Sequence, residues 1–320
     1  MKLKNMTFID LFAGIGGFRY ALESLGCKCV FSSEWDKYCR ESYKLNFDEI
    51  PCGDITKIDE KSIPSFDILC GGFPCQPFSV SGRQKGFMDT RGTLFFDIAR
   101  IVKYHKPKII LLENVKNLKA HNGGATFEVI SSTLNALNYN IYYKVLNAKD
   151  FGLPQNRERI AIVCLRKDID SGKFKFPTDS SSFVTISDIK EDDLKTDKYV
   201  LTRKDIYIDE EKLKKAVENG RVNKPVQIGI IANGGQGNRI YHENGIGITL
   251  AASSGGAASK TGAYYINGRV RKLSPREAAR LQGFPEKFKI IDNDNQALKQ
   301  FGNSVPIPLL KAVFEGLLEV

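Results

Sequence analysis

The chain of 320 residues has one tryptophan, three methionines and three histidines, and it has no long apolar run. Stretches such as residues 109–112 have the length of a strand, far below the ~18 consecutive apolar residues of a membrane span. The N-terminus lacks the basic, apolar and small-residue succession of a secretory signal. With 42% hydrophobic and 26% charged residues, the composition predicts a globular, cytoplasmic protein of about two domains without a membrane partner.

The seven cysteines do not form the pattern of a disulfide framework or of a zinc site. Their number is odd, no two are spaced C-x-x-C, and the three histidines lie far apart in the chain. We therefore predict no disulfide bonds and no metal site, with a small buried side chain as the default for each thiol.

Lysine and arginine outnumber aspartate and glutamate by 47 to 37, which gives a formal net charge of +10. The excess is concentrated between Arg221 and Arg280, where nine basic residues stand against two acidic ones. A basic, glycine-rich segment is typical of contact with a phosphate backbone, whose neutralisation releases counterions. The alternative at this point is a basic surface with no nucleic-acid partner.

The first half of the chain alternates short apolar strands with amphipathic helices. This alternation predicts an α/β fold with a doubly wound, mostly parallel sheet, in which ligands bind beyond the carboxyl ends of the strands. The expected strands are residues 7–12, 29–33, 66–70, 108–112, 141–146 and 160–165, and the expected helices are residues 18–25, 37–45, 93–104 and 127–137.

The pattern changes after Pro177, where a serine-rich bend and a charged helix (209–219) lead into glycine-rich sequence between residues 229 and 268. Helical sequence returns at 275–281 and 308–318. We predict a first domain at 1–185, a smaller glycine-rich domain at 186–273, and a C-terminal segment at 274–320 that returns to the first domain.

Three glycines follow the first strand, in Asp10 to Phe18, and allow a ligand to approach the backbone closely. A dinucleotide fingerprint would need a further glycine where Arg19 stands, which argues against a pyrophosphate. Glu34 follows the second strand and can bind ribose hydroxyls, and Trp35 can cover an adenine face. Asp54 is a further candidate at a strand end. Together they predict an adenosine ligand without phosphates, such as S-adenosylmethionine.

Cys75 lies in a Gly/Pro-shaped loop just after the strand that ends at Cys70, so it is a candidate nucleophile, whereas Cys70 belongs to the core. Glu113 follows another apolar strand, where a buried carboxylate is costly without a purpose. Arg157 and Arg159 are two residues apart and face the same side of an extended segment.

With these residues the sequence resembles the DNA cytosine-5 methyltransferases, above all those of bacterial type II restriction-modification systems. The likeness spans nearly the whole chain and implies a Rossmann-like, S-adenosylmethionine-dependent catalytic domain with a target-recognition domain. The motifs that carry it, in order, are residues 10–18, Pro74-Cys75-Gln76, Glu113-Asn114-Val115, Gln155-x-Arg157-x-Arg159, Arg276-Glu277-x-x-Arg280-x-x-Gly283-Phe284-Pro285 and Gln300-x-Gly302-Asn303-Ser304.

The resemblance implies a reaction on a flipped cytosine, giving 5-methylcytosine and S-adenosylhomocysteine. The Cys75 thiolate would add to carbon 6 and Glu113 would engage N3 and the exocyclic amine. Arg159 would hold the O2 edge, while Arg157 would order the loop and stabilise developing charge. The cofactor contacts implied are Phe12, Gly14, Glu34, Trp35, Asp54, Pro74, Leu94 and Asn303.

The resemblance also implies double-stranded DNA as partner. Ser81 and Gln236 would approach the space left by the flipped base, Arg83 would contact phosphate, and Arg239 would pair with a guanine edge. Residues 234–241 and 260–262 match a subgroup that implies a GCGC-type site with the inner cytosine methylated, although residues 251–258 depart from it. A cognate endonuclease acting on the same site without a stable complex, and a monomeric enzyme, are further expectations.

Three alternatives stay open on the sequence. One is methylation of tRNA by the same motifs, which the long basic recognition segment disfavours. A second is a nicotinamide-dependent dehydrogenase, disfavoured by Arg19 and by the lack of a suitable histidine. A third is a catalytically silent DNA binder, which the intact Cys75, Glu113 and Arg159 disfavour.

Overall fold

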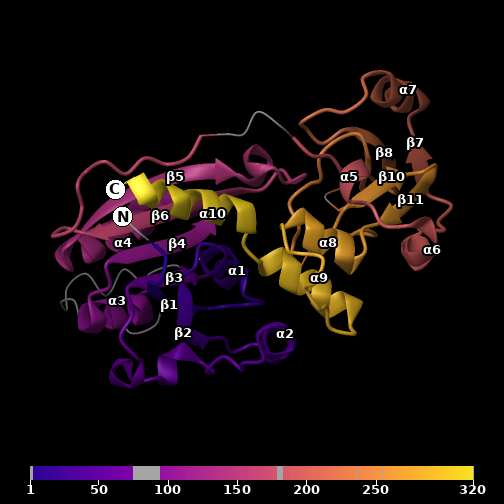
Figure 1. Cartoon of the computed structure of the whole chain (residues 1–320). Coiled ribbons are helices and arrows are strands. Elements are labelled where there is room, and N and C mark those ends of the chain that lie inside the picture. Colours follow the sequence, from indigo (N-terminus) through magenta and orange to yellow (C-terminus); the bar gives the residue numbers. More distant parts are fainter. Residues whose placement is uncertain (1–2, 75–93, 179–182, 236, 254, 320) are drawn as a thin grey trace.

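The computed structural model describes residues 3–74, 94–178, 183–235, 237–253 and 255–319, which form two sheets and the helices around them (Figure 1). The larger sheet has the order β2-β1-β3-β4-β6-β5. Its strands are β1 (Thr7–Leu11), β2 (Lys28–Ser33), β3 (Ile68–Gly72), β4 (Ile109–Val115), β5 (Tyr139–Asn147) and β6 (Glu158–Arg166). All six predicted strands are present, each within three residues of its expected ends.

The strands β2, β1, β3 and β4 are parallel to one another, and β6 is antiparallel to both β4 and β5. The predicted α/β fold with a mostly parallel sheet is therefore confirmed. The reversal at β6 follows from its connection, since residues 148–157 contain one short 3₁₀ turn and no crossover helix of the kind that parallel neighbours need.

Helices cover both faces of this sheet, so its strands are apolar on both sides. Phe18 and Leu22 of α1 (Gly17–Ser24) pack with α10 (Ile307–Glu315) on one face, where α2 (Lys37–Phe47) also lies. The helices α3 (Leu94–His105) and α4 (Ala125–Ala136) cover the other face. This arrangement explains runs such as Ile109–Leu112, in which every side chain is buried.

The smaller sheet has the order β11-β10-β9-β8-β7 and a separate small core that includes Ile228, Ile231 and Ile240. Its strands are short because glycines and turns interrupt the chain. Its elements are β7 (Ile206–Ile208), β8 (Gln227–Ile231), β9 (Arg239–His242), β10 (Ala263–Ile266) and β11 (Arg269–Lys272), with α5 (Ile186–Ile189), α6 (Asp193–Thr196) and α7 (Glu210–Glu218) around them.

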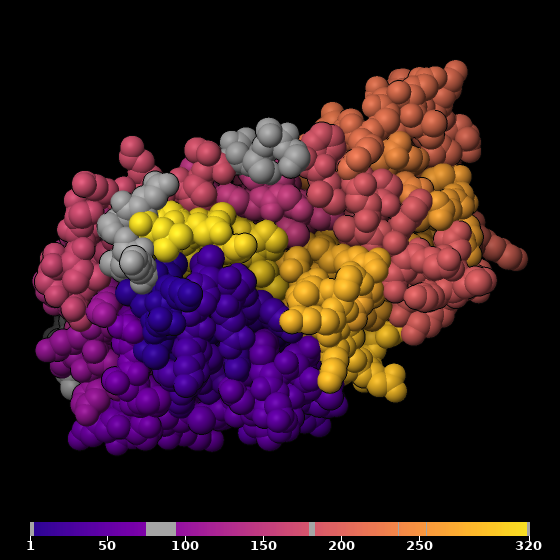
Figure 2. Space-filling view, viewed as in Figure 1, coloured from indigo at the N-terminus to yellow at the C-terminus, as the bar shows by residue number. Residues whose placement is uncertain are grey.

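The C-terminal segment connects the two parts. Figure 1 shows α8 (Pro275–Leu281) and α9 (Asp294–Asn303) between the sheets and α10 lying across the larger one. Figure 2 shows the indigo and yellow ends of the chain side by side on this face. At the junction Arg271 and Glu277 form a fully buried ion pair of 2.7 Å, and Glu277 also accepts from the main-chain nitrogen of Glu191. In the described ranges, no helix has both the length and the apolarity for crossing a bilayer.

Candidate active site

A cavity of about 1260 Å³ opens where the first four strands of the larger sheet end. It brings together residues from the motifs near the N-terminus, in the middle and near the C-terminus of the chain. Its lining includes the acid and the two arginines predicted for catalysis, Glu113, Arg157 and Arg159. It also includes every predicted cofactor residue: Phe12, Gly14, Glu34, Trp35, Asp54, Pro74, Leu94 and Asn303.

The turn after β1 is built from left-handed backbone. Phe12, Gly14 and Gly16 have φ values of 56°, 55° and 84°. Gly16 is the N-cap of α1 and supplies no side chain to its first amides, and a Cβ there would lie 2.4 Å from the ring of Phe47. Glycine is therefore required at this position, and the backbone of the turn is open to a ligand.

Glu34 and Trp35 follow β2 and differ sharply in exposure. The Glu34 carboxylate is 7% exposed and accepts hydrogen bonds of 2.8 Å from the main-chain nitrogens of Gly14 and Asp36. Burial raises its pKa. The Trp35 side chain is 80% exposed, which is unusual for the largest apolar side chain and suits a residue that covers a ligand.

Asp54 caps the 3₁₀ turn η1 (Ile55–Lys57) and also lines the cavity. Its Oδ1 accepts from the main-chain nitrogen of Thr56 at 3.0 Å and from the Thr56 hydroxyl at 2.8 Å. These hydrogen bonds lower the pKa of Asp54, so its carboxylate is charged at neutral pH and can accept a hydrogen bond from an amine.

Glu113 and Arg159 face each other across the antiparallel pair of β4 and β6. Glu113 Oε1 lies 3.2 Å from Arg159 Nε, and no described group gives this oxygen a hydrogen bond. Burial raises the pKa of Glu113, and the charge of Arg159 acts against that shift. The pair therefore presents a carboxyl group with unused hydrogen-bonding capacity beside a cation at the cavity wall.

Arg157 lies beneath this pair and is 2% exposed. Its guanidinium donates to the carbonyl oxygens of Leu250 at 3.2 Å, Gly302 at 3.1 Å and Ser304 at 2.7 Å. Burial and the charge of Arg159 lower its pKa. The contacts join the start of β6 to Leu250 and to residues 302–304, so this arginine connects distant segments of the chain as well as lining the site.

Gly302 belongs to the same junction. A Cβ at this glycine would lie 2.5 Å from the carbonyl carbon of Ala251, so only glycine allows the two segments to approach this closely. The segment from 251 to 258, which departs from the subgroup pattern, therefore begins against the C-terminal motif.

Asn114 is a residue to which the sequence reasoning gave no role of its own. Its Nδ2 donates to the carbonyl oxygen of Phe73 at 2.7 Å, and its Oδ1 accepts from the main-chain nitrogen of Val115. The amide thus fixes the backbone just before Pro74 and Cys75. The sequence signal that could have identified Asn114 is an amide side chain directly after Glu113 at the end of an apolar strand, where a buried polar group needs hydrogen-bond partners.

Four predicted residues, Cys75, Ser81, Arg83 and Gln236, lie outside the described residues. Cys70, predicted to be a core residue, is fully buried. Arg19 does not line the cavity, and it pairs with Glu49 at 2.6 Å.

The basic residues between 221 and 280 are mostly engaged within the protein. Acidic partners pair with Arg221, Arg269, Arg271 and Arg280, and Arg276 and Lys260 donate to main-chain carbonyls. Fewer of these basic residues are therefore free to contact phosphate than the sequence count suggests. Within the described ranges, Lys224, Arg239 and Lys272 have no ion pair, and Arg239 is exposed at the start of β9.

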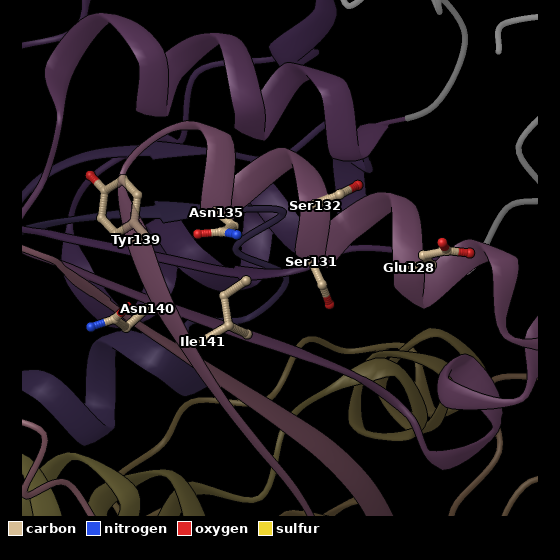
Figure 3. A pocket seen from close by; sticks show the side chains of 7 residues that line it. All are labelled: Glu128, Ser131, Ser132, Asn135, Tyr139, Asn140 and Ile141. Atoms are coloured by element: carbon tan, nitrogen blue, oxygen red, sulfur yellow. The ribbon is translucent and has the colours of Figure 1, made fainter.

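A second hollow, of about 410 Å³, lies between α4 and the start of β5 (Figure 3). Figure 3 shows Ser131 and Ser132 on the helix and Asn140 and Ile141 on the strand. No predicted site residue lines it. Over the described part of the chain, no group of three or more His, Cys, Asp or Glu side chains could hold a metal ion.

Comparisons with known proteins agree with this geometry. A family model described as C-5 cytosine-specific DNA methylase matches residues 6–319. The Type II methyltransferase M.HhaI of Haemophilus parahaemolyticus is 51% identical over 312 residues, covering 98% of this chain and 94% of that protein. The Type II methyltransferase M.HaeII of Haemophilus aegyptius is 46% identical over 320 residues, covering 99% and 94%.

Among solved structures, that of the S. pombe Dnmt2 methyltransferase matches with a TM-score of 0.70 at 18% identity and covers 98% of this chain and 99% of its own. The Entamoeba histolytica methyltransferase EhMeth matches with a TM-score of 0.70 at 20% identity, covering 99% and 98%. These structural matches support the same fold.

Proposed function

Because the chain belongs to the C-5 cytosine-specific DNA methylase family, we propose that it methylates carbon 5 of one cytosine in a short site of duplex DNA, as the modification enzyme of a type II restriction-modification system. The observation that carries this proposal is that one cavity contains both the predicted catalytic and the predicted cofactor residues. It unites the Glu113–Arg159 pair with a wall suited to an adenosine.

S-adenosylmethionine is the proposed methyl donor, and the residues of the cavity fit it. Glu34 presents a buried carboxylate for ribose hydroxyls, Trp35 an exposed indole for the adenine face, and Asp54 a charged acceptor for an amine. Gly14 lines the cavity without a side chain, which leaves room for the methionine part. When bound, this cofactor supplies an electrophilic methyl group on a sulfonium.

The cytosine would be activated by the chain's own residues. The Cys75 thiolate bonds to carbon 6 as the 5,6 double bond opens, and Glu113 in its protonated form gives N3 a proton that returns to Glu113 when the Cys75–carbon bond breaks. Burial raises the pKa of Glu113, which favours this form. Carbon 5 then bonds to the methyl group as the sulfonium becomes a neutral sulfide. A base removes the proton from carbon 5, the electron pair re-forms the 5,6 double bond, and the Cys75–carbon bond breaks.

Arg159 would hold the O2 edge of the base. Arg157, through its contacts with the carbonyls of Leu250 and Ser304, would order the chain around the site and stabilise developing charge. The reacting atoms are inaccessible in a stacked base pair, so the cytosine must leave the duplex. Ser81 and Gln236 are the residues proposed to approach the space it leaves, and Arg83 to contact phosphate.

A GCGC-type site with the inner cytosine methylated is the proposed target. It is supported by the resemblance of residues 234–241 and 260–262 to one subgroup and by 51% identity to M.HhaI. Arg239, exposed and without an ion pair in the described ranges, is proposed as a reader of guanine. The enzyme is further proposed to act as a cytoplasmic monomer. A cognate endonuclease would act on the same DNA site without forming a stable complex with this enzyme.

Base-resolution bisulfite sequencing of a methylation-free bacterial genome tests this proposal, after expression of the protein or of Cys75→Ala. We expect methylation at one short motif, present with the wild type and absent with the variant. Soluble, folded protein that leaves the genome unmodified would overturn the proposal. Methylation of tRNA by the same preparation would then identify an RNA enzyme.

A further inference from the structure

Arg100 of α3 joins two walls of the cavity. Its Nη2 donates to the main-chain carbonyl of Ile55 at 2.6 Å, its Nη1 contacts Glu60 Oε2 at 2.8 Å, and its Nε contacts Asp97 Oδ1 at 3.0 Å. One planar guanidinium is thus shared between its own helix and the segment that follows Asp54. No role was assigned to this residue from the sequence.

The two walls carry different parts of the proposed adenosine site. Asp54 and Ile55 line the cavity from one segment, and Leu94 and Asp97 line it from α3. Arg100 lines it as well and bonds the carbonyl of Ile55. The local hydrogen bonds of Asp54 come from Thr56 and fix only the turn itself. The position of that turn relative to α3 therefore depends on contacts between the two segments.

We propose that Arg100 is a positioning residue for the adenine end of the cofactor, holding the Asp54 turn at the distance from α3 that the ligand requires. The inference rests on the proposed function, because it takes the ligand to be an adenosine. Fixing a loop in its bound conformation increases affinity by reducing the entropy lost on binding. The methyl group reacts at the other end of the cofactor, so the chemical step is not the one affected.

Glu60 separates this role from a direct contact between Arg100 and the ligand. Glu60 holds the guanidinium at 2.8 Å but does not line the cavity. Glu60→Gln weakens the ion pair without removing any group that faces the ligand. If Arg100 is a positioning residue, this variant should bind the cofactor more weakly. If Arg100 contacts the ligand directly, the affinity of this variant should be unchanged.

Arg166 supplies a matched control. It also contacts a carboxylate, that of Asp168 at 2.6 Å, and a main-chain carbonyl, that of Lys106, and its side chain is 26% exposed against 28% for Arg100. It does not line the cavity. Arg166→Met therefore removes the same kinds of interaction from the same domain at a place remote from the cofactor.

The test is isothermal titration of S-adenosylhomocysteine into the wild type and into the Arg100→Met, Arg100→Lys, Glu60→Gln and Arg166→Met variants. We expect Kd to rise about tenfold in Arg100→Met and about threefold in Glu60→Gln and Arg100→Lys, and to stay unchanged in Arg166→Met. In methylation assays, KM for S-adenosylmethionine should rise in parallel while kcat and KM for DNA keep their wild-type values.

Equal weakening in Arg100→Met and Arg166→Met would overturn the proposal in favour of general destabilisation. Weakening in Arg100→Met with none in Glu60→Gln would overturn it in favour of direct contact. If Arg100→Met does not fold, Glu60→Gln and Arg100→Lys decide the question by the same measurement. A wild-type protein that binds no S-adenosylhomocysteine would overturn the proposed function, and this inference with it.

Discussion

Arg157 donates a hydrogen bond of 2.7 Å from Nη2 to the main-chain carbonyl of Ser304, although 147 positions separate the two residues in the chain. The same guanidinium reaches Leu250 and Gly302. One buried cation thus holds three segments of the chain together, and two of them line the cavity, at Arg157 and at Gly302.

Replacing Arg157 by methionine should lower the free energy of unfolding by about 3 kcal/mol, because three buried carbonyls lose a charged donor. Urea denaturation at neutral pH measures the change. Arg203→Met is the comparison, since Arg203 pairs with Asp205 at an exposed site and its loss should change the same quantity by less than about 0.5 kcal/mol. Similar losses in both variants would refute the joining role of Arg157.

Glu113→Gln should lower kcat by about 10²- to 10⁴-fold, because an amide cannot pass a proton to the cytosine ring. The wild-type rate should fall on the alkaline side as the pH passes through the raised pKa of Glu113, since the protonated form is the active one. Single-turnover rates measured over a range of pH will show whether this alkaline decline disappears in the variant. A variant that retains the decline would place the titration on another group.

Trp35→Ala should separate ligand binding from stability. The indole is 80% exposed, so its removal should change the free energy of unfolding by less than about 0.5 kcal/mol. Loss of stacking on adenine should raise Kd for S-adenosylhomocysteine about tenfold, as titration calorimetry can measure. Unchanged affinity would remove Trp35 from the cofactor site.

Arg239→Ala should relax the choice of methylation site by about 1–3 kcal/mol of lost discrimination, because one bidentate contact to guanine disappears. Bisulfite sequencing will show which base position becomes degenerate. The control is Lys224→Ala, which should weaken binding to all sequences alike and reduce its dependence on salt. An unaltered site preference in Arg239→Ala would assign the reading of guanine to another residue.

Asp10→Asn should alter how stability depends on pH. Asp10 is fully buried, neither oxygen has a hydrogen bond from a described group, and burial raises its pKa well above the usual range. In the unfolded chain Asp10 ionises near pH 3.9, whereas in the folded protein it keeps its proton to higher pH. The stability that this group contributes is therefore fully present below about pH 3.9 and is lost as the pH rises toward the folded-state pKa.

The unfolding free energy of Asp10→Asn should therefore increase relative to the wild type as the pH rises from about 4 toward the folded-state pKa. The slope is at most about 1.4 kcal/mol per pH unit. Urea denaturation of both proteins at several pH values measures this difference. A difference that does not vary with pH would mean that Asp10 is ionised in the folded protein.

The sequence by itself determined the elements of the large sheet and the residues of its edge. Apolar runs bounded by turns give strands, and ligand-binding residues follow the strands of a parallel sheet, so Glu34, Asp54 and Glu113 could be named from the pattern. The cofactor roles of Phe12, Pro74, Leu94 and Asn303 came only from the resemblance to the family. The order of the motifs identified the family, because each motif fixes chemistry as well as fold.

Only the tertiary structure decided which of these groups meet. An apolar strand has the same pattern in either direction, so the antiparallel course of β6, which faces Arg159 toward Glu113, was not available from periodicity. A count of charges in the sequence does not show which residues pair, so the ion pairs of Arg269 and Arg271 could not be predicted from the basic segment. The contact of Arg100 with Ile55 joins two segments that are far apart in the sequence, and no local sequence pattern shows that they are close in space.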